Sequence, residues 1–139
     1  MTPFDRAVRA RIYDLFVDGA RRVDAAALAG AGDWDPEEVA GALRRLADEH
    51  RIALTDRGDV AMAHPFSGVP TGYRAVIGDD WWQANCAWDA LAILALLGDG
   101  EARGPEGLVW KVEEGRVHPE GIVHLLVPAL RFWDDVVFT

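Results

Sequence analysis

The chain has 139 residues, of which half are hydrophobic, with one cysteine and a formal net charge of −9. This length is enough for one ordinary globular domain, or for two small lobes that share a core. One cysteine excludes an internal disulfide framework, and no apolar run is long enough to span a bilayer, so we expect a cytoplasmic protein with its thiol reduced. Because the balance is acidic and Lys111 is the only lysine, we expect neither nucleic acid nor a membrane as a partner.

Residues 1–64 are predicted to form a helical lobe that ends in a hairpin. Apolar residues recur at helical spacing in the first segment, and Asp24 and Asp35 are preferred N-cap residues for two further helices. Three helices followed by a hairpin is the order of a winged-helix domain, so we expect a winged-helix-like lobe. The expected elements are helices from Phe4 to Phe16, over 25–29 with its end at Gly30, and from 36 onward, with strands over 52–55 and 60–63.

Charge argues against DNA binding by this lobe. The third helix of a winged-helix domain usually enters the major groove with its N-terminal residues at the bases. Here Asp35, Glu37 and Glu38 stand at that end, and residues 1–64 carry nine arginines against twelve acids. Since DNA binding needs net positive patches, we place a winged-helix regulator behind the other functions considered below.

A second lobe is predicted after a connector. Residues 65–72 are rich in proline and glycine and mark the boundary. Over 73–139 we expect a small, mostly antiparallel sheet packed around one buried helix, which makes the fold class α+β. The expected extended segments are 73–77, 81–82, 108–113, 117, 123–127 and 132–139, with a loop after Gly98.

The helix of this second lobe begins near the cysteine. From Cys86 to Leu97 every residue except Asp89 is apolar, so the helix is predicted to be buried all round, and it is too short to cross a bilayer. Asn85 is a preferred N-cap and Gly98 a preferred C-terminal residue, which places Cys86 in the first turn. Asp89 follows three residues later on the same helix face, at the positive end of the helix dipole, a setting that favours a thiolate.

A purely structural interpretation stands beside this chemical one. A lone cysteine in an apolar helix is more often an inert small hydrophobic residue than a nucleophile. Tryptophans at the same end of the helix favour function, because aromatic walls with one thiol and one carboxyl suit a small pocket for a soft, apolar ligand. A zinc site is not indicated, since none of the histidines shows zinc-ligand spacing with the cysteine. The tryptophans are Trp81, Trp82 and Trp88, and the histidines are His50, His64, His118 and His124.

Three segments together resemble the alkylmercury lyase (organomercurial lyase) family. They are His-Pro-Phe-Ser-Gly-Val-Pro-Thr at 64–71, Asn-Cys-Ala-Trp-Asp-Ala-Leu at 85–91 and Phe-Trp-Asp-Asp-Val-Val-Phe-Thr at 132–139. The resemblance implies an enzyme that breaks carbon–mercury bonds without a cofactor: thiolates bind mercury, and an aspartate delivers a proton to the leaving carbon. Cys86 matches the family's first cysteine and Asp89 its aspartate. The residues expected to line the substrate pocket are Phe66, Trp82, Trp88 and Trp133.

The second cysteine of the family has no counterpart in this sequence. The family places it just after a Phe-Thr pair that here is Phe138-Thr139, where the sequence stops. We expect either a truncated form, which an ending inside an apparent strand favours, or a divergent member that cannot hold mercury with two thiolates of its own. Small-molecule thiols are then expected partners, beside a small organomercurial or another soft ligand.

Three functions therefore stay open at this point. They are a lyase-like enzyme, a catalytically inactive ligand-binding, metal-binding or biosynthetic accessory protein, and a winged-helix regulator. In the lyase, soft mercury prefers the thiolate of Cys86, and Asp89 protonates the carbon. Burial and a neighbouring thiolate favour the protonated acid that this step needs, whereas the helix dipole favours the carboxylate.

Overall fold

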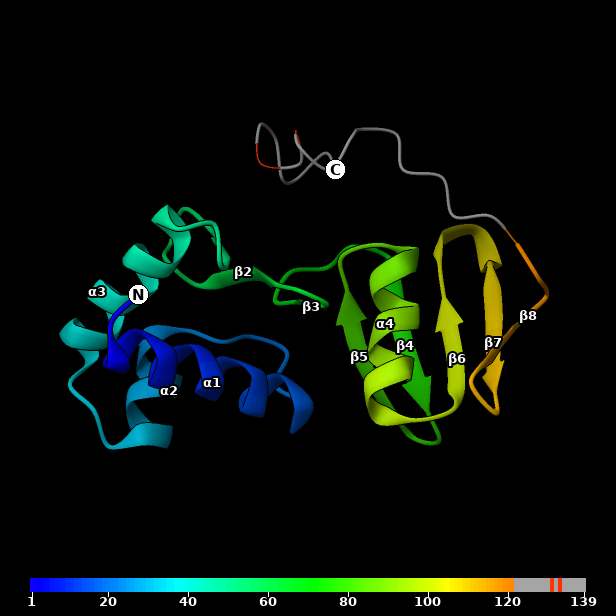
Figure 1. The fold of residues 1–139 in the computed structure, drawn as a ribbon, viewed down its shortest axis with the longest axis horizontal. Coiled ribbons are helices and arrows are strands. Elements are labelled where there is room, and N and C mark those ends of the chain that lie inside the picture. The colour runs from blue at the N-terminus through cyan, green and yellow to red at the C-terminus, as the bar shows by residue number, and fades with distance from the viewer. Residues whose placement is uncertain (122–130, 132, 134–139) are drawn as a thin grey trace.

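The computed structural model describes residues 1–121, 131 and 133. In this part of the chain the helices of the N-terminal lobe come first, and the strands form one antiparallel sheet, so the predicted α+β class is confirmed (Figure 1). The extended segments predicted over 123–127 and 132–139 lie outside the described residues, apart from Trp133. The elements are α1 (Pro3–Val17), α2 (Ala25–Gly32), α3 (Pro36–Asp48), β1 (Ala53–Leu54), β2 (Val60–Ala63), β3 (Phe66–Ser67), β4 (Tyr73–Ile77), β5 (Asp80–Ala84), α4 (Ala87–Leu97), β6 (Gly100–Arg103), the short 3₁₀ helix η1 (Pro105–Gly107), β7 (Val109–Glu113) and β8 (Arg116–His118).

Side-chain caps start the helices of the N-terminal lobe. Asp24 and Asp35 cap α2 and α3 as predicted: Asp24 accepts one backbone N–H of the first helical turn, and Asp35 accepts two. The predicted end of the second helix at Gly30 is wrong, because α2 continues to Gly32 and stops where Asp33 takes up a left-handed conformation with φ of 53°. A glycine inside a helix costs only about 1 kcal/mol relative to alanine, so the alanine-rich segment continues through it.

An ion pair between a buried aspartate and a half-exposed arginine joins α1 to α3. The Asp5 side chain is 1% exposed, and Arg45 donates to its Oδ1 from Nη2 at 2.6 Å and from Nε at 3.0 Å. Asp5 also completes a capping box with Thr2, whose backbone N lies 2.6 Å from Oδ2. The hydrogen bonds from Arg45, followed by that from the Thr2 backbone, lower the pKa of Asp5 to about 2.

We expect Asp5→Ala to lower the free energy of unfolding by about 1.5–3 kcal/mol at pH 5, the range for hydrogen bonds to a charged group. Because the folded pKa is below the unfolded value of 3.8, the ionised Asp5 contributes its stability above pH 3.8 and loses it as the pH falls toward about 2. Urea titrations of both proteins at pH 5 and pH 2.5 measure this, with Asp14→Ala, an exposed acid of the same helix, as the control. A difference that does not shrink at the lower pH would contradict the assignment.

The sheet runs without a break from one lobe to the other. Its strand order is β1-β2-β3-β5-β4-β6-β7-β8, and β3, inside the predicted connector, pairs with both β2 and β5. The predicted loop after Gly98 is wrong in part, because it contains β6, which pairs with β4 and β7. Gly100–Arg103 offers a single buried apolar residue, Ala102, so the alternation that marks a strand is not visible in the sequence.

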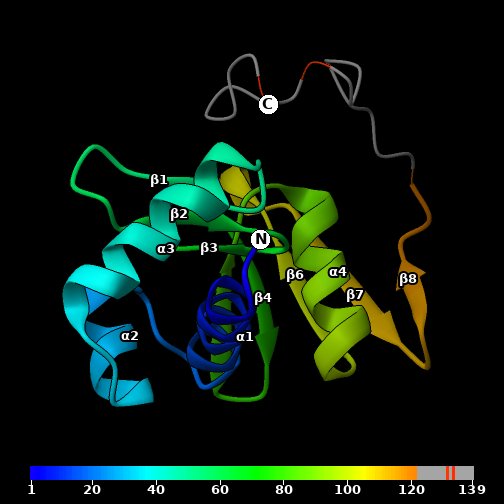
Figure 2. The same ribbon diagram turned by 60° about the vertical axis from the view of Figure 1, so that its left-hand side comes forward.

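Helix α4 lies on one face of the sheet against β4, β5 and β6. In both ribbon views α4 lies with these strands (Figure 1 and Figure 2), and in Figure 1 α1 to α3 group at the other end of the molecule. The prediction that this helix is buried all round is wrong: Trp88 is 60% exposed and Leu96 is 67% exposed. The buried side chains Ala90, Ile93 and Leu94 follow helical spacing, because the sheet covers only one face of the helix.

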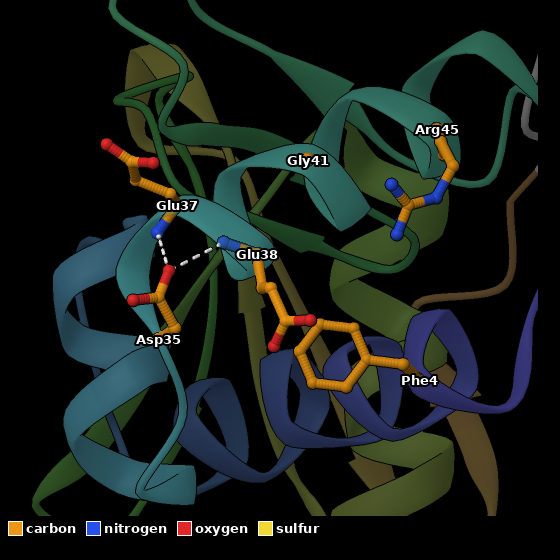
Figure 3. A pocket seen from close by; sticks show the side chains of 6 residues that line it. All are labelled: Phe4, Asp35, Glu37, Glu38, Gly41 and Arg45. Atoms are coloured by element: carbon orange, nitrogen blue, oxygen red, sulfur yellow. Dashed lines mark hydrogen bonds between the residues drawn. The ribbon is translucent and has the colours of Figure 1, made fainter.

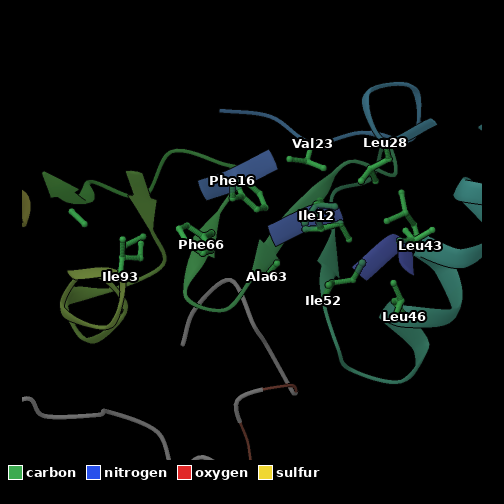
Figure 4. Close-up of a cluster of buried hydrophobic side chains, with 14 of the residues drawn as sticks. Ile12, Phe16, Val23, Leu28, Leu43, Leu46, Ile52, Ala63, Phe66 and Ile93 are labelled. Atoms are coloured by element: carbon green, nitrogen blue, oxygen red, sulfur yellow. The ribbon is translucent and has the colours of Figure 1, made fainter. Parts of the chain in front are cut away.

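One hydrophobic cluster extends through both lobes (Figure 4). It includes Leu43 on α3, Phe16 on α1, Phe66 on β3 and Ile93 on α4. Phe16 and Phe66 lie nearly parallel at the centre of this cluster, with ring centroids 5.6 Å apart. The N-terminal helices and the sheet therefore share a core.

Candidate functional site

Strand β5 leads directly into α4 and leaves Cys86 at the junction. Cys86 is the N-cap residue, and its half-buried side chain makes no capping hydrogen bond. The prediction that Asn85 is the N-cap is therefore wrong by one residue. The Asn85 side chain instead donates from Nδ2 to Oδ2 of Asp89 at 2.8 Å, a charge-assisted hydrogen bond.

The carboxylate of Asp89 is the buried acid of this junction. Its side chain is 7% exposed, and the Asp89 residue belongs to the same first helical turn that follows Cys86. Besides Asn85, its partner is His64, whose Nδ1 lies 3.2 Å from Oδ2 and 3.4 Å from Oδ1. The described structure thus surrounds the predicted aspartate with two side-chain nitrogens from two different segments of the chain.

His64 is a site residue that sequence reasoning missed. It lies 25 positions before Asp89, at the turn between β2 and β3, and only the pairing of β3 with β5 brings the two together. Its hydrogen bond with Asp89 raises the pKa of His64 above its usual value, and burial opposes this rise. The available signal was its place at the head of the 64–71 segment that carries the family resemblance.

The rest of that segment supports the start of α4. The hydroxyl of Thr71 donates to the carbonyl of Ala84, the last residue of β5. A Cβ at Gly68 would lie 2.0 Å from the carbonyl oxygen of Val60, so this close approach of two backbones requires glycine. The 64–71 segment therefore positions the junction that carries Asn85.

The structure does not favour the thiolate that the helix dipole predicted. Burial raises the pKa of the Cys86 thiol above its ordinary value, and the charge of Asp89 adds to this rise. The backbone N–H groups of Asp89 and Trp88 lower the pKa, but they do not outweigh burial. The prediction of a partly ionised Cys86 near neutral pH is therefore wrong for the unliganded protein, because loss of hydration disfavours the charged sulfur.

We expect the alkylation rate of Cys86 to rise with an apparent pKa above that of a free thiol, about 8.5. Asp89→Asn should lower this value, because it removes the nearby negative charge. Iodoacetamide kinetics between pH 6 and 10 measure both, with Asp79→Asn, in the exposed turn before β5, as the control. An apparent pKa below that of the free thiol would restore the thiolate prediction.

The predicted pocket residues lie in different surroundings. Trp88 is exposed at the start of α4, whereas Phe66 is buried in the core. Trp82 donates from Nε1 to the carbonyl of Val17 at 3.1 Å. Trp133 stacks on His50 with ring centroids 4.7 Å apart. Their role in a substrate pocket stays a prediction, with Trp88 the one of the four that is exposed beside Cys86.

A hollow of about 380 Å³ lies away from this junction, on α1 and α3. Figure 3 shows its lining, in which the Asp35 carboxylate accepts from the backbone N–H groups of Glu37 and Glu38. These bonds are the N-cap of α3, and Glu37 and Glu38 are acids of its first turn, where the helix dipole favours negative charge. The lining residues are Phe4, Asp35, Glu37, Glu38, Gly41 and Arg45.

Residues 1–121, 131 and 133 show neither a cluster of metal ligands nor a membrane-spanning helix. Three or more His, Cys, Asp or Glu side chains do not gather as a metal-binding group in this part of the chain. None of its helices combines the length and the apolar character needed to span a membrane.

Comparison with known proteins gives a fold but no family membership. No family model and no curated protein matches the chain. Among solved structures, the chain is similar to the crystal structure of the mercury-bound form of MerB2, with a TM-score of 0.64 and 20% sequence identity over 84% of this chain. The chain spans 59% of the length of that MerB2 chain. The described structure therefore has a MerB-like fold, in agreement with the resemblance seen in the sequence.

Proposed function

We propose that this chain is an organomercurial lyase-like protein, in which Cys86 captures the mercury of a small organomercurial and Asp89 protonates the leaving carbon. One observation carries the proposal: a thiol and a buried, hydrogen-bonded carboxylate meet at the start of one helix in a fold similar to that of mercury-bound MerB2. Mercury is soft and prefers sulfur, which makes Cys86 the capturing group. Trp88 is the predicted aromatic contact for the organic substituent.

Capture does not require that Cys86 be ionised beforehand. Metal binding to a thiol releases its proton, so formation of the S–Hg bond overcomes the raised pKa of Cys86. The sulfur displaces the weaker ligand opposite the carbon, and a small-molecule thiol supplies the second thiolate that this sequence lacks.

Cleavage then transfers one proton. The C–Hg bond breaks with its electron pair on carbon, the carboxyl proton of Asp89 forms the new C–H bond, and Asp89 is left as a carboxylate. Mercury stays in the divalent state throughout, bound to thiolates, so no electron donor or cofactor takes part. The products are a hydrocarbon and a dithiolate complex of Hg(II).

The alternative is a catalytically inactive protein that binds soft ligands, an accessory role without turnover. The raised pKa of Cys86 favours this alternative, because it weakens activation of the C–Hg bond. The two proposals share capture at Cys86 and differ in release of the hydrocarbon.

Benzene release from a phenylmercury compound distinguishes the two proposals. Protein and excess small-molecule thiol are compared with thiol alone, and bound mercury is measured in the same samples. Release above the thiol background supports the lyase, and bound mercury without such release supports the inactive binding protein. Absence of both would overturn the two proposals together.

Nucleic acid and membrane have no part in the proposed function. The start of α3, which would face phosphates in a DNA complex, carries the exposed acids Asp35, Glu37 and Glu38. A regulator that binds DNA is disfavoured by this charge. A cytoplasmic location belongs to the same proposal, since a reducing compartment keeps Cys86 free to bind mercury.

A further inference from the structure

We infer that His64 is the positioning residue of this site: His64 holds the proton that Asp89 passes to carbon, and after each turnover His64 takes up a new proton from solvent. This inference rests on the proposed function and adds a route for the proton. Its basis is a contact between one buried and one exposed group: the Asp89 side chain is 7% exposed, and the His64 side chain is 56% exposed. Asp89 has little access to water of its own, whereas the imidazole reaches both water and the carboxylate.

The contacts of Asp89 fit a resting state in which His64 holds the proton. Asn85 Nδ2 donates to Oδ2 at 2.8 Å, and Nδ1 of His64 lies 3.2 Å from the same oxygen. The N–H donated by Asn85 suits a carboxylate at Asp89, and in the imidazolium form of His64 Nδ1 carries a proton that the same carboxylate can accept. The raised pKa of His64 agrees with an imidazolium–carboxylate pair.

One proton moves along this pair for each C–Hg bond broken. As negative charge builds on carbon, the Nδ1 proton passes to Oδ2 and the carboxyl proton passes to carbon, which leaves a neutral imidazole and a carboxylate. The imidazole then takes a proton from water or buffer. The hydrogen bond from Asn85 keeps the carboxylate in place. The Asn85 amide does not ionise at neutral pH, so it takes no part in the proton transfer.

A protonated His64 gives hydrocarbon release a defined pH dependence. Among the described residues, Asp89 on α4 is the charged group that contacts His64, and Cys86 is the other titratable group of the junction. His64 must be protonated, so hydrocarbon release should be full below the usual histidine pKa of about 6.5 and should fall as the pH rises through the raised value of His64. Ionisation of Cys86 would change the rate in the opposite direction.

The test is release of benzene from phenylmercury by His64→Ala in the presence and absence of added imidazole. We expect a loss of about 10²-fold, the lower end of what general acid catalysis contributes. Imidazole should restore part of the rate to His64→Ala and none to Asp89→Ala, since a free proton carrier replaces the first group only. His118→Ala, at the exposed end of β8, is the matched control and should behave as wild type. Every rate is corrected with Cys86→Ser at the same imidazole concentration, because imidazole also binds mercury.

The outcomes separate the two proposals. If wild type releases benzene and His64→Ala does so at the same rate, the role of His64 is overturned while the proposed function stands. The same conclusion follows if His64→Ala is slower, imidazole does not restore its rate, and the rate still falls at high pH as in wild type. Absence of wild-type release above the thiol background would overturn the proposed function and this inference with it. Independently of turnover, an NMR titration should show a lower pKa of His64 in Asp89→Asn, and an unchanged value would overturn the coupled pair.

Discussion

Asp89→Ala is expected to bind phenylmercury as wild type does and to release benzene about 10²–10⁴-fold more slowly, the range that general acid catalysis spans. Cys86→Ser is expected to lose capture itself, because a hydroxyl is a poor ligand for a soft metal. The two variants thus separate capture from protonation. Mercury bound per protein and benzene released per minute are measured side by side, with excess small-molecule thiol in every sample.

Loss of the buried carboxylate also removes the partner of two polar side chains, Asn85 and His64. A slower release could therefore come from altered folding and not from loss of the acid. Asp89→Asn is the second variant, because asparagine keeps the shape of aspartate and two hydrogen-bonding atoms. It should fold as wild type by far-UV circular dichroism and be as slow as Asp89→Ala. Asp79→Ala, in an exposed turn, controls for general loss of charge. Release from both Asp89 variants at the wild-type rate would show that the proton comes from another group.

The sequence was sufficient for the parts of the site that depend on local helical geometry. Cys86 and Asp89 lie three residues apart, so any helix that begins here brings them to one face, whatever the rest of the fold does. The exact N-cap was not predictable, because the helix starts one residue later, at Cys86, and Asn85 contacts the buried carboxylate of Asp89 from just outside the helix.

Contacts that depend on the sheet could not be predicted in this way. His64 and Asp89 are 25 residues apart, and their contact requires the register in which Phe66 on β3 opposes Ala84 on β5. β3 is two residues long, too short to show any alternation. The exposure of Trp88 was missed for a related reason. An apolar sequence shows that a helix can be buried, but the fraction of its surface that is buried depends on how many of its faces pack against other elements.

The pKa of Cys86 shows where a correct local argument gave a wrong result. The helix start does lower the pKa, as the dipole argument requires, through the backbone N–H groups of Asp89 and Trp88. Burial of the sulfur has the larger effect, and the extent of burial follows from packing that the sequence does not specify.

Phe66→Ala is expected to lower the free energy of unfolding by about 3–5 kcal/mol, the usual cost of emptying a buried phenylalanine site. Phe66 is 2% exposed and stacks on Phe16 with ring centroids 5.6 Å apart. It also packs against Tyr13 in an edge-to-face arrangement with ring centroids 6.4 Å apart. It lies on β3, the strand that joins the hairpin to β5, so the cavity opens between the N-terminal helices and the sheet. Phe4→Ala is the matched control, because Phe4 is partly exposed and should cost less.

Urea unfolding followed by far-UV circular dichroism and by tryptophan fluorescence also tests whether the shared core makes the chain cooperative. The two signals should change at one urea concentration in wild type, and in Phe66→Ala both should move together to a lower one. A cost below about 1 kcal/mol, which is typical of surface substitutions and not of core ones, would contradict the central place of Phe66. Two separate transitions in wild type would show that the helices and the sheet unfold independently, despite the stacked rings of Phe16 and Phe66 that join them.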